Sequence, residues 1–177
     1  MRNVFSSTNI VDRSMKTLVF TEGTLIMNSG ARRLSREETV KQVQEEKNTS
    51  IYEYKNYIPV GNSARKLHLW KNQGAEIVYL TSRTKPAEIE EIMNVLKKHG
   101  FPDGQLLFRG EGEEYKDVAE RAMPNVIVED DCESIGGESE MTYTHVEPEL
   151  KKGIKSVAVK EFGGIDHLPD SIFTLKT

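Results

Sequence analysis

The stretch "TLVFTEGTLI", residues 17–26, decides how this sequence is expected to fold. It begins with a run of β-branched and apolar residues, which stops abruptly at Thr21-Glu22-Gly23-Thr24. A short continuous apolar run is typical of a strand that is covered on both faces, as in a parallel sheet. We therefore expect a buried strand that ends in a polar turn, where α/β proteins commonly bind ligands.

Four more apolar runs repeat this pattern further along the chain. They are "IVYL" (77–80), "LLF" (106–108), "VIV" (126–128) and "SVAV" (156–159). Three segments between the runs carry apolar residues at helical spacing, namely residues 63–74, 86–100 and 112–123. This alternation of strands and helices predicts an α/β protein with a parallel sheet.

Residues 28–61 interrupt the alternation. The segment "SREETVKQVQEEKN" begins with Ser35 and carries Glu38 three residues later, which is the pattern of a capping box at a helix start. Its apolar stripe is thin, because only Val40 and Val43 contribute to it. The sequence therefore predicts a small, mostly helical insertion after the first strand. The segment that follows residue 132 is expected to be a long loop with some helical content.

The size and composition of the chain limit the classes of function. Its 177 residues suit one domain, expected at 15–177 after a flexible N-terminal extension at 1–14. A net charge of -4 gives no broad basic surface for nucleic acid. No apolar run approaches the roughly 18 residues that a membrane span needs, and the start has no clear secretion signal. With Cys132 as the single cysteine, no internal disulfide forms, and a cytoplasmic location is expected.

Polar residues directly follow every apolar run. In order along the chain they are Thr21 and Glu22; Thr81, Ser82 and Arg83; Arg109; Glu129, Asp130 and Asp131; and Lys160 and Glu161. In an open parallel sheet the carboxyl ends of the strands share one edge, and ligands bind there. The sequence thus predicts one edge of the sheet that carries hydroxyl groups, cations and clustered carboxylates.

This edge has the composition of a phosphate and metal site. Asp130 and Asp131 would repel each other without a cation nearby, and carboxylates are ligands that Mg²⁺ prefers. Thr81 and the N–H groups at the next helix start are suited to hold phosphoryl oxygens. Lys116, early in its helix, would add a positive charge that balances the anion.

Each of these residues also has a purely structural interpretation. Thr81 is suited to cap the helix after its strand, and Lys116 to pair with Glu113 or Glu120 on its own helix. Arg109 is typical of the solvated surface where strands end. The acidic cluster is harder to explain in this way, because it follows a buried run directly.

The order of these signals resembles the haloacid dehalogenase-like (HAD-like) superfamily. "LVFTEGTLI" is similar to its first motif, a strand that leads into Asp-x-Asp-Gly-Thr, and "IVYLTSR" is similar to its second, at Thr81. Lys116 stands where the third motif has its lysine, and Asp130 and Asp131 in "VIVEDDCESIGG" resemble the Mg²⁺-binding acids of the fourth. The resemblance implies a Rossmann-like three-layer sandwich with a mostly parallel sheet and a small helical cap at 28–61.

The first motif departs from the superfamily pattern. Aligning Glu22-Gly23-Thr24 with the Asp-Gly-Thr half places Phe20 at the nucleophilic aspartate, whereas a one-residue deletion places Thr21 there. Neither side chain has a carboxylate, so the resemblance implies a divergent member that lacks the nucleophile. Glu22 would imitate the second, proton-shuttling aspartate. We expect Phe20 to be a core residue and Thr21 to point toward the ligand edge.

Three sets of roles follow from the resemblance, which covers residues 15–165. Catalytic roles fall on Thr21, Glu22 and Lys116; phosphate-binding roles on Gly23, Thr24, Thr81, Ser82 and Arg83; and metal-binding roles on Glu22, Asp130 and Asp131. The preferred function is a divergent Mg²⁺-dependent phosphohydrolase that acts on a small phosphorylated compound. The alternatives are a catalytically silent phosphate- or metal-binding protein with a regulatory role, and an interaction protein without a ligand. Neither nucleic acid nor a membrane is expected as a partner.

Overall fold

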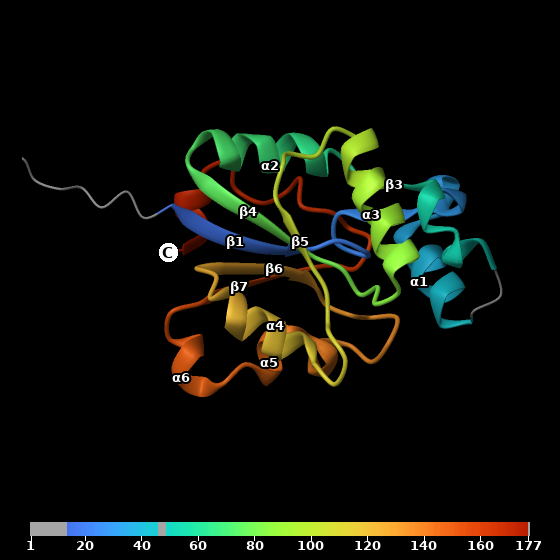
Figure 1. The fold of residues 1–177 in the computed structure, drawn as a ribbon. Coiled ribbons are helices and arrows are strands. Elements are labelled where there is room, and N and C mark those ends of the chain that lie inside the picture. Colours follow the sequence, from blue (N-terminus) through green and yellow to red (C-terminus); the bar gives the residue numbers. More distant parts are fainter. Residues whose placement is uncertain (1–13, 46–48, 177) are drawn as a thin grey trace, which may run out of the picture.

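The computed structural model describes residues 14–45 and 49–176, and Figure 1 shows its fold. A five-stranded sheet with the order β5-β4-β1-β6-β7 forms the middle layer, and neighbouring strands are parallel throughout. The strands are β1 (Met15–Phe20), β4 (Ala75–Leu80), β5 (Gln105–Leu107), β6 (Val126–Asp130) and β7 (Lys155–Val159). Each predicted run forms one strand, so the predicted parallel sheet is confirmed. Residues 1–13 of the expected N-terminal extension lie outside the described residues.

Helices cover both faces of this sheet (Figure 1). On one face lie α2 (Ser63–Asn72) and α3 (Pro86–Lys98), and on the other lie α4 (Tyr115–Ala122), α5 (Thr142–His145) and α6 (Pro148–Lys151). The three layers confirm the expected Rossmann-like α/β sandwich. Within residues 14–45 and 49–176, no helix combines the length and the apolar character that a bilayer span requires.

Alternating side chains of the strands build a core on each face of the sheet. Leu18 and Val19 of β1 are both fully buried, yet they belong to different clusters of apolar side chains. Val19 lies in the cluster that contains Trp70 of α2 and Ile92 of α3. Leu18 lies in the cluster that contains Val118 of α4. This coverage from both sides is the reason that the strands are continuous apolar runs in the sequence.

The starts of α1 (Arg36–Gln44) and α2 are stabilised in different ways, one by neighbouring residues and one by a residue distant in the sequence. At α1, the Glu38 N–H donates to the Ser35 hydroxyl at 3.2 Å and the Ser35 N–H donates to the Glu38 carboxylate at 2.7 Å, so the predicted capping box is present. At α2, the N-cap residue is Asn62, and its side chain makes no capping hydrogen bond. Instead the Asn62 N–H donates to the carboxylate of Asp166 at 2.9 Å, a partner too distant in the sequence to be predicted.

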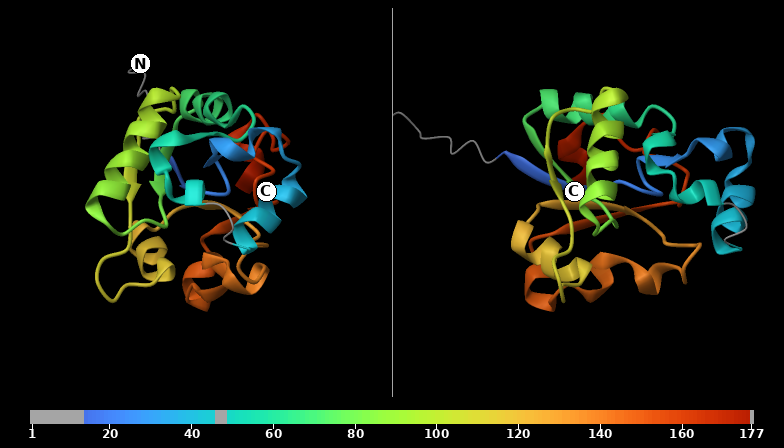
Figure 2. Two further views of the ribbon diagram at one scale, coloured as in Figure 1. Left: turned by 90° about the vertical axis from the view of Figure 1, so that its right-hand side faces the viewer. Right: turned by 45° about the vertical axis from the view of Figure 1, so that its right-hand side comes forward.

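The described part of the 28–61 segment lies beyond the carboxyl ends of the strands (Figure 1 and the right-hand view of Figure 2). It is flanked by β2 (Ile26–Asn28) and β3 (Tyr57–Pro59), which pair antiparallel. Its described helices are α1 and the 3₁₀ helices η1 (Ser29–Arg33), η2 (Thr49–Tyr52) and η3 (Tyr54–Asn56). The β2–β3 ribbon was not predicted, because three-residue strands are too short to carry a periodic signal. Two further 3₁₀ helices are η4 (Glu138–Glu140) and η5 (Ile172–Lys176).

Candidate functional site

The carboxyl ends of β1, β4 and β6 meet at one rim of the sheet. Glu22 follows β1, and its carboxylate accepts a hydrogen bond of 2.7 Å from the hydroxyl of Thr81, which follows β4. Thr24 donates its hydroxyl proton to Asp130, at the end of β6, over 2.8 Å. Residues that resemble the first, second and fourth motifs are therefore close together in space, although about 60 and 50 positions separate them in the chain.

Gly23 lies between these two contacts and requires a glycine. Its φ of +82° falls in a region that L side chains rarely adopt. A Cβ at this position would lie only 2.8 Å from Oδ2 of Asp130 and 3.4 Å from Cγ of Glu161. The turn after β1 thus packs its backbone directly against the acidic end of β6.

Glu22 occupies the hydrogen-bond donors that were predicted to hold a phosphoryl group. Besides Thr81, Ser82 donates its N–H and its hydroxyl to the Glu22 carboxylate, each at 3.3 Å. Nε of Arg83 lies 3.3 Å from the same carboxylate in an ion pair, and the Thr21 hydroxyl also donates to it. An internal anion therefore takes up the donors at the tip of β4.

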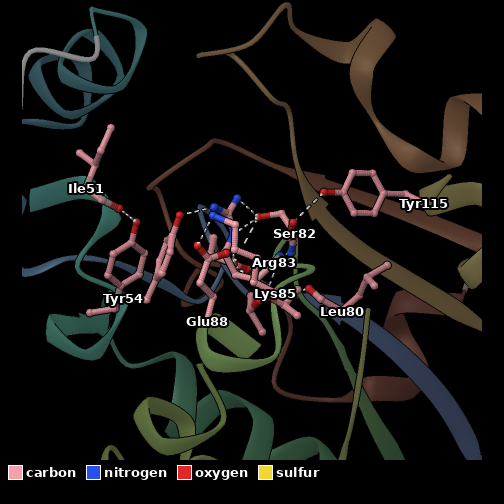
Figure 3. A network of polar contacts seen from close by, with 12 residues as sticks. Ile51, Tyr54, Leu80, Ser82, Arg83, Lys85, Glu88 and Tyr115 are labelled. Carbon is pink, nitrogen blue, oxygen red and sulfur yellow. Dashed lines mark hydrogen bonds and ion pairs between the residues drawn. The ribbon is translucent and has the colours of Figure 1, made fainter. Parts of the chain in front are cut away.

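Arg83 connects this rim with the 28–61 segment. Figure 3 shows its guanidinium group between Ser82 and Tyr54, and it donates to both hydroxyl groups. Its central carbon also lies over the Tyr54 ring, 4.7 Å from the ring centre, as in a cation–π contact. Tyr115 reaches the same place from α4, with its hydroxyl 3.5 Å from the backbone carbonyl oxygen of Ser82 (Figure 3).

The two candidates for the nucleophile position face different surroundings. Phe20, expected in the core, is only half-buried and lies on the wall of a cavity, edge-on to Tyr115 with ring centres 5.8 Å apart. Thr21, expected to point toward the ligand, is fully buried and is not part of that wall. Its N–H donates to the carbonyl of Leu80 at 3.0 Å, and its hydroxyl oxygen lies 3.2 Å from the same carbonyl oxygen. The backbone ladder between β1 and β4 continues through Thr21, whose side chain lies outside the cavity wall.

Lys116 is not part of the cavity wall. It lies in the first turn of α4, and its ammonium group is 3.8 Å from the carboxylate of Glu114. Of the partners considered from the sequence, Glu113 is paired with Arg121 instead. The neighbouring Tyr115 is the residue through which this helix contributes to the cavity.

The three carboxylates proposed as Mg²⁺ ligands do not converge. Glu22 is turned toward the β4 tip, whereas Asp130 accepts hydrogen bonds from Thr24 and from the N–H of Cys132. Asp131 is paired with Lys160 over 2.8 Å. Among residues 14–45 and 49–176, no three His, Cys, Asp or Glu side chains stand close enough together to hold a metal ion. These residues, as arranged, do not fit the Mg²⁺ site that the resemblance implies.

Burial changes the pKa values of the carboxyl groups behind the rim. Glu129 and Glu161 have raised pKa values, because burial penalises their charged forms. The pKa of Asp130 is raised for the same reason. Burial alone would also raise the pKa of Asp131, but the hydrogen bond from the Lys160 ammonium group and the charge of that group lower it overall.

A cavity of about 350 Å³ opens between the rim, the 28–61 segment and the loop after β6. Of the predicted site residues, its wall includes Glu22, Gly23, Ser82, Arg83 and Asp130, whereas Thr21, Thr24, Thr81, Asp131 and Lys116 lie outside it. Glu129 and Glu161 line it too, and the sequence analysis assigned them no role. Both belong to the polar residues after apolar runs, so position was the available signal, but burial could not be inferred from it.

No protein-family model matches this sequence, and a search of curated proteins finds no match. Among solved structures, a chain of the Pnkp1/Rnl/Hen1 RNA repair complex is similar, with a TM-score of 0.52 and 15% identity over 83% of this chain and 43% of that chain. The class C acid phosphatase from Bacillus anthracis with tungstate bound gives a TM-score of 0.53 and 14% identity over 85% of this chain and 69% of that chain.

These likenesses concern the fold. The chain spans less than half of the similar chain in the RNA repair complex, and the identities are too low to transfer an activity. Together with the sheet order and the three layers, they define a Rossmann-like α/β protein with a class C acid phosphatase among its structural neighbours.

Proposed function

We propose that this chain is a HAD-like binding protein, which holds a small molecule in the rim cavity and does not hydrolyse phosphate esters through an aspartyl-phosphate intermediate. The observation that carries the proposal is the apolar ring of Phe20 on the cavity wall, at the position that the motif alignment without a deletion gives to the nucleophile, whereas the alternative Thr21 lies outside that wall. A phenyl ring cannot attack phosphorus, and losing a covalent nucleophile removes most of the rate of such enzymes. Such a protein would act by reporting ligand occupancy to a partner.

The position of Glu22 supports the same proposal. A phosphoryl group that used Thr81 and Ser82 would have to displace the Glu22 carboxylate from its hydrogen bonds. If Glu22 remained nearby, its charge would repel the incoming anion. The β4 tip is therefore poorly suited to bind phosphate in the arrangement described.

The second candidate is a divergent Mg²⁺-dependent phosphohydrolase that acts on a small phosphorylated compound. It is favoured by one specific observation: Glu22, Thr81 and Asp130 lie at one rim, which is the set that such chemistry would use. It requires Glu22 to leave Thr81 and turn toward Asp130, because the carboxylates do not converge as they stand.

Phosphate release from a panel of phosphomonoesters, measured with and without Mg²⁺, tests the two candidates against each other. The binding proposal predicts that the wild type and a Glu22→Gln variant both remain at the rate of the buffer blank. A Mg²⁺-dependent rate in the wild type that is lost in Glu22→Gln would contradict the binding proposal and support the phosphohydrolase. A commercial acid phosphatase serves as the positive control for the assay.

A further inference from the structure

The charge of the cavity wall differs from that of the chain as a whole. The chain has 28 acidic and 24 basic residues, so its two signs are nearly balanced. On the part of the cavity wall that the described residues form, five carboxyl side chains face one cationic side chain, Arg83. The five are Glu22, Glu129, Asp130, Glu140 and Glu161. A concave surface with one dominant sign of charge concentrates the field and attracts ions of the opposite sign.

Three of these carboxyl groups are held by neutral donors. Glu129, which is 2% exposed, accepts hydrogen bonds from the N–H groups that open α5, at 2.8 and 2.9 Å. Glu161 accepts from the N–H and the hydroxyl of Ser134, both at 2.7 Å. Asp130 accepts from Thr24 and Cys132. Burial raises the pKa of all three groups, but hydrogen bonds from neutral donors do not cancel the charge of a carboxylate, so each group that is ionised adds to a negative potential in the cavity.

Aromatic rings form much of the same wall. Among the residues that the structure describes, six phenylalanine and tyrosine side chains line the cavity: Phe20, Tyr52, Tyr54, Tyr57, Tyr115 and Phe162. The faces of such rings attract cations, most strongly where water is displaced. One such contact is already made from within the protein, because the Arg83 guanidinium lies over the Tyr54 ring and against the Glu22 carboxylate (Figure 3).

We propose that this cavity binds a small organic cation, an ammonium or guanidinium compound, between the aromatic rings and the buried carboxylates. The inference rests on the proposed function, in which the cavity is a ligand site. The Arg83 contact shows the pairing that a ligand would repeat, with a ring face on one side and a carboxylate on the other. A free phosphate ion has the same sign of charge as the carboxylates of the cavity wall, so they would repel it. No three carboxyl groups of the described residues stand close enough together to hold a metal ion, whereas the aromatic part of the wall suits the apolar surface of an organic cation.

Binding of three cations to the full chain tests the proposal by calorimetry and by thermal unfolding. The probes are choline, putrescine and agmatine, with inorganic phosphate and Mg²⁺ each added separately. The neutral controls are dimethylbutanol, in which carbon replaces the nitrogen of choline, and butanediol, which replaces putrescine. We expect at least one cation to raise the melting temperature and to bind about ten-fold more tightly than its neutral counterpart, as a desolvated cation–π contact would provide.

Two pairs of variants locate the binding to this cavity. Glu140 and Glu138 are both exposed residues of η4, but only Glu140 lines the cavity. Glu140→Gln should weaken cation binding about three-fold, as expected for a solvent-screened charge, and Glu138→Gln should leave it unchanged. Tyr52→Leu should weaken it about three- to five-fold by removing a ring face, whereas the equally exposed Phe173→Leu should not.

The outcomes separate this inference from the function on which it rests. The inference is overturned if no cation binds at millimolar concentration, if the neutral counterparts bind equally well, or if the control variants lose binding as much as their partners. Stabilisation by inorganic phosphate or Mg²⁺ without stabilisation by any cation would overturn it too, while leaving a binding protein in place. Mg²⁺-dependent phosphate release would instead overturn the proposed function, whatever the cations do.

Discussion

The tips of β4 and β6 lie at the same rim of the sheet, but their charged groups have different kinds of partners. At the β4 tip, Thr81, Ser82 and Arg83 supply donors and a cation, and the Glu22 carboxylate uses all three residues. At the β6 tip, Glu129 and Asp130 supply carboxylates that neutral donors hold in place. One tip is internally balanced, and the other keeps its negative charge.

This difference changes what the rim can bind. At the β4 tip Arg83 compensates the charge of Glu22. At the β6 tip Lys160 pairs with Asp131, which lies outside the cavity wall, and neutral donors hold the two carboxyl groups of β6 that line it. The β4 tip, where the sequence predicts a phosphate site, is therefore already filled by the protein itself. The β6 tip and the cavity beside it are where an added positive charge would gain the most. Three changes in the protein would break or sharpen this contrast.

The largest effect is expected at the turn that joins the two tips. Gly23→Ala forces a side chain into a left-handed backbone conformation and places its Cβ 2.8 Å from Oδ2 of Asp130. We expect a loss of about 3 kcal/mol in the free energy of unfolding, measured by urea denaturation, from the sum of backbone strain and steric conflict.

Gly112→Ala is the matched control for that variant. Gly112 also has a positive φ, of +76°, but no atom lies within 4 Å of the added Cβ. We expect a loss of only about 1 kcal/mol from backbone strain. Equal losses in the two variants would mean that the close approach of Gly23 to Asp130 does not matter for stability.

A smaller effect is expected at the β4 tip. Thr81→Val keeps the shape of a fully buried side chain but removes the hydroxyl that donates to Glu22 over 2.7 Å. The free energy of unfolding should fall by about 1.5 kcal/mol, because a partly buried carboxylate loses a donor. Thr144→Val removes an exposed hydroxyl and should cost less than about 0.5 kcal/mol. If Thr81→Val is as harmless as its control, Glu22 does not depend on the β4 tip.

The strands and the positions of the site residues could be predicted from the sequence, but the directions of the side chains could not. The five strands, their parallel pairing and the meeting of Glu22, Thr81 and Asp130 all follow from apolar runs whose ends share one edge. The direction of a side chain does not follow from its position in the chain. For this reason the sequence could place Lys116 in the first turn of its helix and Thr21 beside the rim, but it could not show that both side chains lie outside the cavity wall.

The acidic part of the cavity was beyond sequence analysis for a different reason. Glu161 follows β7, where polar residues are usually solvated, and its burial depends on Ser134 and on the turn at Gly23. Those contacts join segments that are remote in the sequence. The β2–β3 ribbon was missed because pairing of two three-residue strands is a property of the folded chain.

The smallest effect is expected at the β6 side and depends on pH. Glu161→Gln keeps both hydrogen bonds to Ser134, since an amide can accept from the N–H and donate to the hydroxyl oxygen. The pKa of Glu161 is raised in the folded state by burial, so its contribution to stability is complete below its ordinary pKa of 4.5 and is lost as the pH rises through the folded value.

The amide of the Glu161→Gln variant does not ionise, so the variant does not lose stability as the pH rises. We therefore expect the variant to be slightly more stable than the wild type near neutral pH and to lose this advantage toward pH 4.5. Urea denaturation over this pH range measures the difference. Glu138→Gln, at an exposed position of η4, controls for the removal of one negative charge. A wild type that is the more stable protein at neutral pH would show that Glu161 carries its charge without cost.

The central claim is that Glu22 has taken the place of a phosphoryl group at the β4 tip. A crystal structure determined with Mg²⁺ and a high concentration of phosphate tests this most directly. We predict that the Thr81 hydroxyl and the Ser82 N–H still donate to the Glu22 carboxylate and that no phosphate lies between Thr81 and Asp130. Phosphate bound at that point, with Glu22 displaced and a metal ion on Asp130, would contradict the account.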